Sequence, residues 1–203
     1  SLSTIEDVDI VCVSDIDESV CQETTKKFNI PKYTLTYEDL VSDPEVDAVW
    51  VCSPSNFHFT HVTACLRNNK LVFCEKPLEI DVEKIKQLID PFPDINKRLM
   101  VGFNRRFDPN FSFVKNNIKK IGKPTILKIT SRDPQPPPID YIKSSGGIFM
   151  DMTIHDFDMA YFMIGAKPFS VYATGSVNYN PEFKGIDFDT ALITIKFENG
   201  VVC

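Results

Sequence analysis

The chain has 203 residues, of which 43% are hydrophobic and 25% charged, a composition typical of a globular protein with one large domain or two small ones. Its net charge of −6 argues against nucleic acid or an anionic membrane as a partner. No apolar run reaches the length of a membrane span and no signal-peptide pattern opens the chain, so no membrane partner is expected.

The first half of the chain alternates between strand and helix patterns. Strand-like runs occupy residues 8–15, 33–35, 48–54, 70–77 and 98–104. Helical patterns occupy residues 17–28, 37–41, 57–69 and a stretch from 82 onwards. Asp81 can cap the last of these helices, and Pro91 and Pro93 end it. Apolar strands separated by helices predict a parallel sheet covered on both faces.

The pattern changes after about Phe103. The sequence predicts a helix at 109–120 stopped by Gly122, a half-buried strand at 124–132 and an extended proline-rich loop at 133–140. A helix at 144–165 and antiparallel strands at 169–177 and 188–197 follow. We therefore predict an α/β protein with a Rossmann-type parallel sheet at 1–103. An α+β domain with an open, mostly antiparallel sheet is predicted at 104–203.

The six cysteines include no CxxC pair. Cys12, Cys52 and Cys74 each lie in an apolar, strand-like run. Buried free thiols in a reducing compartment are favoured over disulfides, so a cytoplasmic protein is expected.

Asp15 ends the first strand, where a dinucleotide fold places the acid that binds ribose hydroxyls. In that fold a strand and a GxGxxG turn come about 20 residues earlier. Only 14 residues precede Asp15, and none is glycine. In the strand order 3-2-1-4-5-6 the sheet would lack its centre and expose two inner edges. We therefore expect a chain truncated at both ends, lacking strand 1 and cut off soon after Asn199-Gly200.

Three motifs carry a family resemblance: CEKP at 74–77, VGFNRRFDP at 101–109 and SGGIFMDMTIHDFD at 145–158. In this order, over nearly the whole chain, the sequence resembles the glucose–fructose oxidoreductase / inositol dehydrogenase (Gfo/Idh/MocA) family, and most closely its inositol 2-dehydrogenases. The resemblance implies an NAD(P)-binding Rossmann domain and a second domain whose sheet commonly forms an oligomer interface. A homo-oligomer is therefore expected of the full-length protein.

The resemblance also implies hydride transfer from a secondary alcohol of a cyclic polyol or sugar to NAD, with myo-inositol as the first candidate. A related sugar or dihydrodiol dehydrogenase is the alternative. A truncated, non-catalytic product that cannot bind cofactor is another.

Oxidising an alcohol requires a hydride acceptor and a base for the hydroxyl proton. Histidine suits that base near neutral pH, and Asp151 lies one helical turn before His155, so both side chains are expected on one face. Lys76 follows a strand end, where its ammonium could bind the reacting oxygen. The resemblance implies that Lys76, Asp151 and His155 form the catalytic group. A core histidine and a solvated lysine are the alternatives, and a metal site at His155, Asp156 and Asp158 is disfavoured.

The run CSPSNFHF at 52–59 resembles the family's cofactor loop. The expected cofactor contacts are Asp15, Ser53, Pro54, Asn56, His58, Glu75, Lys76, Asn104 and Arg105. An acid at position 15 favours NAD because it would repel a 2′-phosphate, although NADP stays an alternative. A plain strand-to-helix turn is the alternative for the loop, and His61 is expected on the helix surface or in packing. Arg106 is equally suited to a structural ion pair, and a polyol contact by Tyr141 is less favoured.

Overall fold

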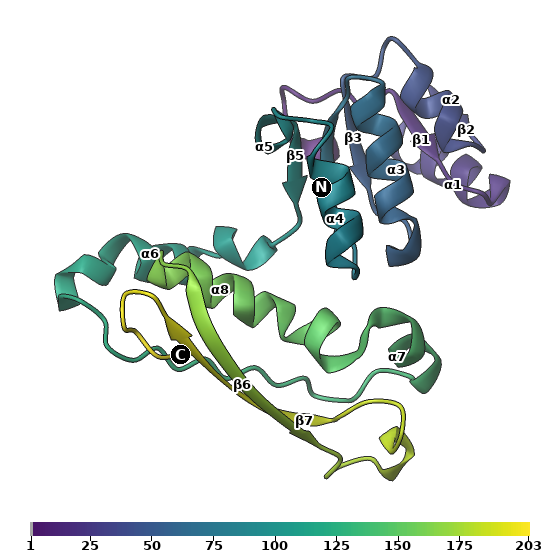
Figure 1. The fold of residues 1–203 in the computed structure, drawn as a ribbon. Helices are drawn as coiled ribbons and strands as arrows, with labels where there is room; N and C mark the ends of the chain where they lie inside the picture. The colour runs from purple at the N-terminus through teal and green to yellow at the C-terminus, as the bar shows by residue number, and fades with distance from the viewer. Residues whose placement is uncertain (1) are drawn as a thin grey trace. The chain divides into compact units, whose positions relative to one another are not determined.

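The computed structural model describes residues 2–203, apart from the side chain of Ser144, and divides the chain into two units. The first unit ends at Gly102, and the second spans Phe103–Cys203 (Figure 1). Each unit has its own strands, helices and buried core.

The strands of the first unit form two parallel sheets. These strands are β1 (Cys12–Ser14), β2 (Lys32–Thr34), β3 (Ala48–Val51), β4 (Leu71–Cys74) and β5 (Leu99–Val101). β1 pairs with β2, while β3, β4 and β5 pair in that order. Within residues 2–203, β1 and β3 do not pair, so the strands form two separate sheets rather than one. β1 is shorter than the predicted run at 8–15 because only three of its residues pair with β2.

Four helices of the first unit follow the predicted order: α1 (Glu18–Phe28), α2 (Tyr37–Ser42), α3 (Ser55–Arg67) and α4 (Val82–Ile89). The short helix α5 (Ile95–Arg98) and the 3-10 turn η1 (Leu2–Thr4) were not predicted. The Asp81 carboxylate accepts a hydrogen bond from the Glu83 amide at 2.9 Å, which confirms the predicted cap of α4. Asp17 caps α1 in the same way through Ser19. These caps satisfy amides that the helix itself leaves without acceptors.

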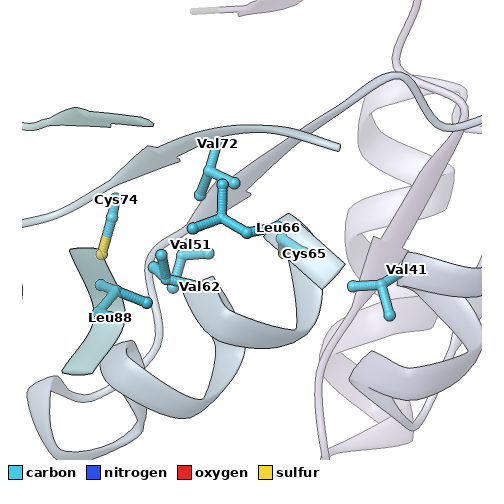
Figure 2. Close-up of a cluster of buried hydrophobic side chains, with 8 residues drawn as sticks. All are labelled: Val41, Val51, Val62, Cys65, Leu66, Val72, Cys74 and Leu88. Atoms are coloured by element: carbon cyan, nitrogen blue, oxygen red, sulfur yellow. The ribbon is translucent and has the colours of Figure 1, made fainter. Parts of the chain in front are cut away.

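Helices α3 and α4 cover one face of the β3–β5 sheet. Figure 2 shows the buried apolar cluster of this region, to which α2 adds Val41, each side chain being at most 4% exposed: Val41, Val51, Val62, Cys65, Leu66, Val72, Cys74 and Leu88. On the opposite face Trp50, Leu71 and Met100 are about half exposed. The prediction that both faces are covered is therefore wrong for the β3–β5 sheet among the described residues, because α3 and α4 pack on the same side of it.

The second unit combines helical segments with an antiparallel ribbon. Its helical segments are η2 (Asn104–Phe107), α6 (Pro109–Asn117), η3 (Ile118–Ile121), α7 (Ile139–Ser145), η4 (Ile148–Met152), α8 (Ile154–Ile164) and η5 (Pro181–Phe183). β6 (Pro168–Ser176) and β7 (Thr190–Phe197) confirm the two predicted strands. Ala160 of α8 packs with Phe197 and Val201 in the core of this unit, and α8 runs along the ribbon in Figure 1.

Two predicted elements of the second unit differ from the structure, although α8 lies within the predicted helix at 144–165. The predicted strand at 124–132 forms only an isolated bridge at Ile126, beside a hydrogen bond from the Leu127 amide to Val202 O. The alternation of apolar and polar residues in this segment therefore reflects partial burial of its side chains, without the row of backbone hydrogen bonds that a β-strand makes.

The predicted helix at 144–165 is interrupted at Gly146 and Gly147, whose φ angles of 84° and 71° lie in the left-handed region. The helix predicted at 109–120 ends at Asn117 and continues as a 3-10 turn.

All six cysteines are free, as predicted. Cys21, Cys65 and Cys74 are buried, and burial raises the pKa of Cys74 to about 12, which suits an unreactive packing residue. Cys52 is exposed just beyond β3, so the expectation of burial is wrong for that thiol. Among residues 2–203, no helix combines the length and apolarity needed to span a bilayer.

Candidate active site

The carboxyl ends of β3 and β4 lie next to each other in the first unit. The strands are parallel, with Val51 opposite Cys74, and the Glu75 amide donates to Val51 O at 2.9 Å. Ser53 and Lys76 each follow these paired positions by two residues. The register therefore brings the predicted cofactor loop and the predicted catalytic lysine to one sheet edge. This is the edge at which open α/β sheets bind ligands.

His58 lies in α3 and is 1% exposed. Its Nδ1 is 2.7 Å from the carbonyl oxygen of Pro77, and its Nε2 is 2.7 Å from that of Ser53. A carbonyl oxygen can only accept, so the ring nitrogen that carries the proton donates to the carbonyl oxygen facing it. Both polar atoms of a residue predicted to contact the dinucleotide are thus bound to the two loops of this edge.

His61 holds the other polar group of Ser53. The Ser53 hydroxyl lies 2.9 Å from His61 Nδ1, and the imidazole packs against Tyr37 and Phe57 at centroid distances of 4.5 and 5.7 Å. Burial, followed by the nearby charge of His58, lowers the pKa of His61. Sequence reasoning assigned His61 only to packing or the surface. Its spacing of three residues from His58 was the signal that both rings lie on one face of α3.

The other predicted residues of the first unit lie at strand ends. Asp15 is exposed after β1, and its carboxylate accepts a hydrogen bond from the Asp17 amide at 3.0 Å. Pro54 occupies the N-cap position of α3, and Asn56 is exposed in the first turn. Glu75 is exposed beside Gly102, where an added Cβ would lie 3.2 Å from the Glu75 carboxylate.

In the second unit, Asp151 lies in η4, which is a single π-helical turn. The Thr153 amide donates to Ile148 O at 2.8 Å, five residues earlier, and such turns are frequent at functional sites. His155 follows in the first turn of α8. The expected common face for Asp151 and His155 assumed a regular α-helix, so that spacing argument does not apply here. Their pairing stays a prediction.

Two consecutive residues, Asp187 and Phe188, hold the π-helical turn. The Asp187 carboxylate accepts a hydrogen bond from the Ile148 amide at 2.6 Å, and the ring of Phe188 meets that of Phe149 edge-on. Gly147 has a positive φ, and an added Cβ there would lie 2.6 Å from the Asp187 carboxylate. Glycine at 147 therefore permits both the backbone turn and the approach of Asp187.

Tyr141 connects α7 to this turn. Its hydroxyl donates to Asp151 Oδ1 at 3.0 Å. Burial, followed by the hydrogen bond to Asp151, raises the pKa of Tyr141, so the phenol remains a donor at neutral pH. Sequence reasoning considered Tyr141 only as a polyol contact and missed its bond to the predicted catalytic carboxylate.

Two arginines pair with the aspartates that follow His155. Arg105 Nη1 donates to Asp156 Oδ1 at 2.7 Å, and Ser131 donates to the same oxygen. Arg106 binds Asp158 through two nitrogens, and its guanidinium lies over the ring of Phe162. The ion-pair alternative for Arg106 is therefore confirmed. Both carboxylates are occupied by arginine, which further disfavours the metal interpretation.

The predicted catalytic residues belong to different units. Lys76, which is half-buried, lies in the first unit, whereas Asp151 and His155 lie in the second, as do Arg105 and the exposed Asn104. The structure brings Lys76 to the Ser53 edge and Asp151 to Tyr141. The combination of Lys76, Asp151 and His155 in one site is a proposal based on the family resemblance.

Comparison with known families matches both parts of the chain. The family described as "Oxidoreductase family, NAD-binding Rossmann fold" (GFO/IDH/MocA) matches residues 2–103, and the GFO/IDH/MocA C-terminal domain matches residues 117–203. The myo-inositol 2-dehydrogenase of Thermotoga maritima is 44% identical over 100% of this chain and 61% of its own length. The chain thus spans about three-fifths of the length of this curated relative.

Solved structures agree with these matches. A probable dehydrogenase from Thermotoga maritima, 43% identical, matches 96% of this chain and 60% of its own with a TM-score of 0.92. The scyllo-inositol dehydrogenase of Lactobacillus casei with bound NAD(H) and scyllo-inositol is 26% identical. It covers 99% of this chain and 62% of its own, with a TM-score of 0.88.

Proposed function

The chain belongs to the GFO/IDH/MocA oxidoreductase family, and on that premise we propose that the protein is an NAD-dependent dehydrogenase of a secondary alcohol. Its substrate in this proposal is a cyclic polyol, with myo-inositol as the first candidate. The names of the relatives support that choice, as does the related structure that contains NAD(H) and scyllo-inositol. A related sugar or a dihydrodiol is the alternative substrate.

The observation that carries the proposal is the register of β3 and β4. Both strands end at the same edge of the sheet, and Ser53, in the predicted cofactor loop, and Lys76, the predicted donor to the reacting oxygen, each follow a paired position by two residues. A dehydrogenase needs this proximity because the hydride acceptor and the alcohol must meet at one point.

Three side chains would act on one alcohol group. NAD, when bound, accepts the hydride on its nicotinamide ring. His155 removes the hydroxyl proton as general base. Lys76 donates a hydrogen bond to the same oxygen and stabilises the negative charge that develops there. Asp151, held by the Tyr141 hydroxyl, accepts a hydrogen bond from a substrate hydroxyl or orients His155.

The strand-end residues fit a dinucleotide without a 2′-phosphate. Asp15 is exposed after β1, so its carboxylate can accept hydrogen bonds from ribose hydroxyls and would repel a further phosphate. The remaining proposed contacts are Ser53, Pro54, Asn56, Glu75, Lys76, Asn104 and Arg105. His58 belongs to the same loop region, but its buried ring binds carbonyl oxygens at both nitrogens.

The proposal also includes location and assembly. We place the reaction in the cytoplasm, which the six free cysteines support, because a reducing compartment keeps thiols unpaired. We further propose a homo-oligomer for the full-length protein, on the family resemblance.

The experiment is an NADH absorbance assay of the full-length protein against myo-inositol, scyllo-inositol, an aldose and a dihydrodiol, each with NAD and with NADP. We expect the fastest reduction with an inositol and NAD. Preference for the aldose or the dihydrodiol would change the substrate and keep the reaction class. Failure to reduce either cofactor with any polyol or sugar would remove the proposal.

A further inference from the structure

One buried side chain joins the two loops of the β3–β4 edge. The His58 ring is 1% exposed and binds Pro77 O through Nδ1 and Ser53 O through Nε2, each at 2.7 Å. The ring thus has each of its nitrogens at hydrogen-bond distance from a carbonyl oxygen of a different loop. It therefore fixes the separation between these two backbone positions.

Both positions are adjacent to groups in the proposed site. Pro77 directly follows Lys76, and Ser53 begins the proposed cofactor loop. The Ser53 hydroxyl also lies 2.9 Å from His61 Nδ1. Two histidines one turn apart on α3 thus hold Ser53 through its carbonyl and its hydroxyl, and one of them also holds the lysine loop.

We propose that His58 is a positioning residue, which keeps the Lys76 loop and the Ser53 loop at the separation that hydride transfer requires. The inference rests on the proposed function. His58 acts through the backbone on either side of the site rather than through contact with the substrate. Removal of the bridge would move the Lys76 ammonium relative to the reacting oxygen, and a shift of about 1 Å in such a group can cost about 10²-fold in rate.

The same sheet offers a matched control at its opposite edge. Lys70 is 9% exposed, and its Nζ donates to the carbonyl oxygens of Asp43 and Val46, each at 2.7 Å. It therefore bridges two backbone carbonyls, as His58 does. These carbonyls precede β3, whereas those bound by His58 follow β3 and β4. Lys70→Met removes an equal number of hydrogen bonds without touching the proposed site.

The kinetic experiment compares His58→Leu, His58→Gln and Lys70→Met in the full-length protein. All three are assayed with NAD and myo-inositol below their unfolding transitions. We expect His58→Leu and Lys70→Met to lower the melting temperature. Only the His58 variants should lower kcat, by about 10- to 100-fold with a smaller change in KM, because Lys76 acts on charge that develops in the transition state. His58→Gln keeps a donor and should recover part of the rate.

A second readout does not depend on activity. Cys52 is exposed next to Ser53, so its alkylation rate, followed by peptide mass spectrometry, reports on the loop. We expect His58→Leu to raise this rate several-fold and Lys70→Met to leave it unchanged. If His58→Leu does not fold, the alkylation rate and kcat of His58→Gln are compared with those of Lys70→Met instead.

The outcomes separate the two proposals. Rates of turnover and alkylation in the His58 variants within twofold of those in Lys70→Met would overturn the role of His58. An inactive wild-type protein would instead overturn the proposed function, and the alkylation rates alone would then decide whether His58 positions the loops.

Discussion

Single side chains hold the groups proposed for catalysis. The Tyr141 hydroxyl donates to Asp151, and the His58 imidazole joins the backbone on either side of the site in the first unit. Neither Tyr141 nor His58 needs to touch the alcohol to influence the rate. Their contribution is to limit the orientations of Asp151 and of the loop that contains Lys76.

Tyr141→Phe should reduce kcat/KM for the polyol by about 2- to 12-fold, which corresponds to the loss of one hydrogen bond of about 0.5–1.5 kcal/mol. Steady-state kinetics with NAD and myo-inositol would measure the change. Tyr161→Phe is the control, because that tyrosine lies half-exposed on α8. Equal kinetics for Tyr141→Phe and wild type would contradict a role for the bond to Asp151.

Lys76→Met should lower kcat by about 10²- to 10³-fold, the usual effect of removing a donor to a developing oxyanion. Binding of NADH, followed by titration, should change far less. Lys84→Met is the control, because Lys84 lies outside the proposed site, and its side chain is half-exposed with a long 3.5 Å contact to Glu79. If Lys76→Met kept the kcat of Lys84→Met, Lys76 would have no part in the chemistry.

At the scale of elements, the π-helical turn depends on contacts distant in sequence. Asp187 is 39 residues from Ile148, yet its carboxylate binds the first amide of the turn. Gly147 gives that carboxylate room. The position of Asp151 is therefore set by the connection between β6 and β7 as much as by its own segment.

Gly147→Ala should destabilise the second unit more than Gly185→Ala. Both glycines have positive φ, at 71° and 78°, which costs an alanine about 1–2 kcal/mol. Only at Gly147 would the added Cβ meet the Asp187 carboxylate, whereas nothing lies within 4 Å at Gly185. We expect an additional loss of about 1 kcal/mol or more in urea unfolding, since Asp187 must move. Equal losses would show that the close approach is unimportant.

Asp189 holds the start of the same connection. Hydrogen bonds from the amides of Asn178, Asn180 and Tyr179 and from the Thr190 hydroxyl lower its pKa to about 2. The pKa of an aspartate in an unfolded chain is about 3.9. The stabilisation is therefore complete above about pH 4 and is lost as the pH falls towards about 2.

Asp189→Asn should lower stability at neutral pH and flatten the loss of stability between about pH 4 and about pH 2. Urea midpoints measured across this range would test it. Asp140→Asn is the comparison, because that side chain is 95% exposed. A wild-type acid dependence that persists in Asp189→Asn would assign the effect to other carboxyl groups.

Local patterns were sufficient for elements whose contacts are mainly local. Helical patterns predicted α1 and α4, the latter with its cap at Asp81, and apolar runs predicted β3 and β4. They failed at 124–132, because a strand needs a ladder partner that alternation alone does not reveal. In the candidate site, the motifs pointed to Lys76, Asp151 and His155. The bridge from His58 to Pro77 spans 19 residues and depends on the β3–β4 register, so no local pattern could show it.

At the scale of the whole molecule, each unit has its own core. Leu88 of α4 is 1% exposed within the core of the first unit, while its neighbour Ile89 is 44% exposed. The sequence pattern predicted α4, but it did not predict that one face of the β3–β5 sheet is left open. Whether a face is open depends on which side of the sheet α3 and α4 occupy.

Leu88→Ala should lower the free energy of unfolding of the first unit by about 2–5 kcal/mol, because it removes buried contacts and leaves a cavity. Ile89→Ala should cost about 0.5 kcal/mol or less, as a surface change does. Chemical denaturation with amide exchange in the first unit would measure both. Similar losses for the two variants would contradict the assigned orientation of α4.

Trp50 is the sole tryptophan of the chain, and it stands on β3 with its indole stacked against Phe73 at a centroid distance of 5.7 Å. Its fluorescence therefore gives a built-in optical signal from the first unit, whereas circular dichroism sums over both. Denaturation curves that coincide in the two signals mean that the units melt together. If the two curves differ, the tryptophan fluorescence gives the unfolding midpoint of the first unit separately from that of the second, without any added label.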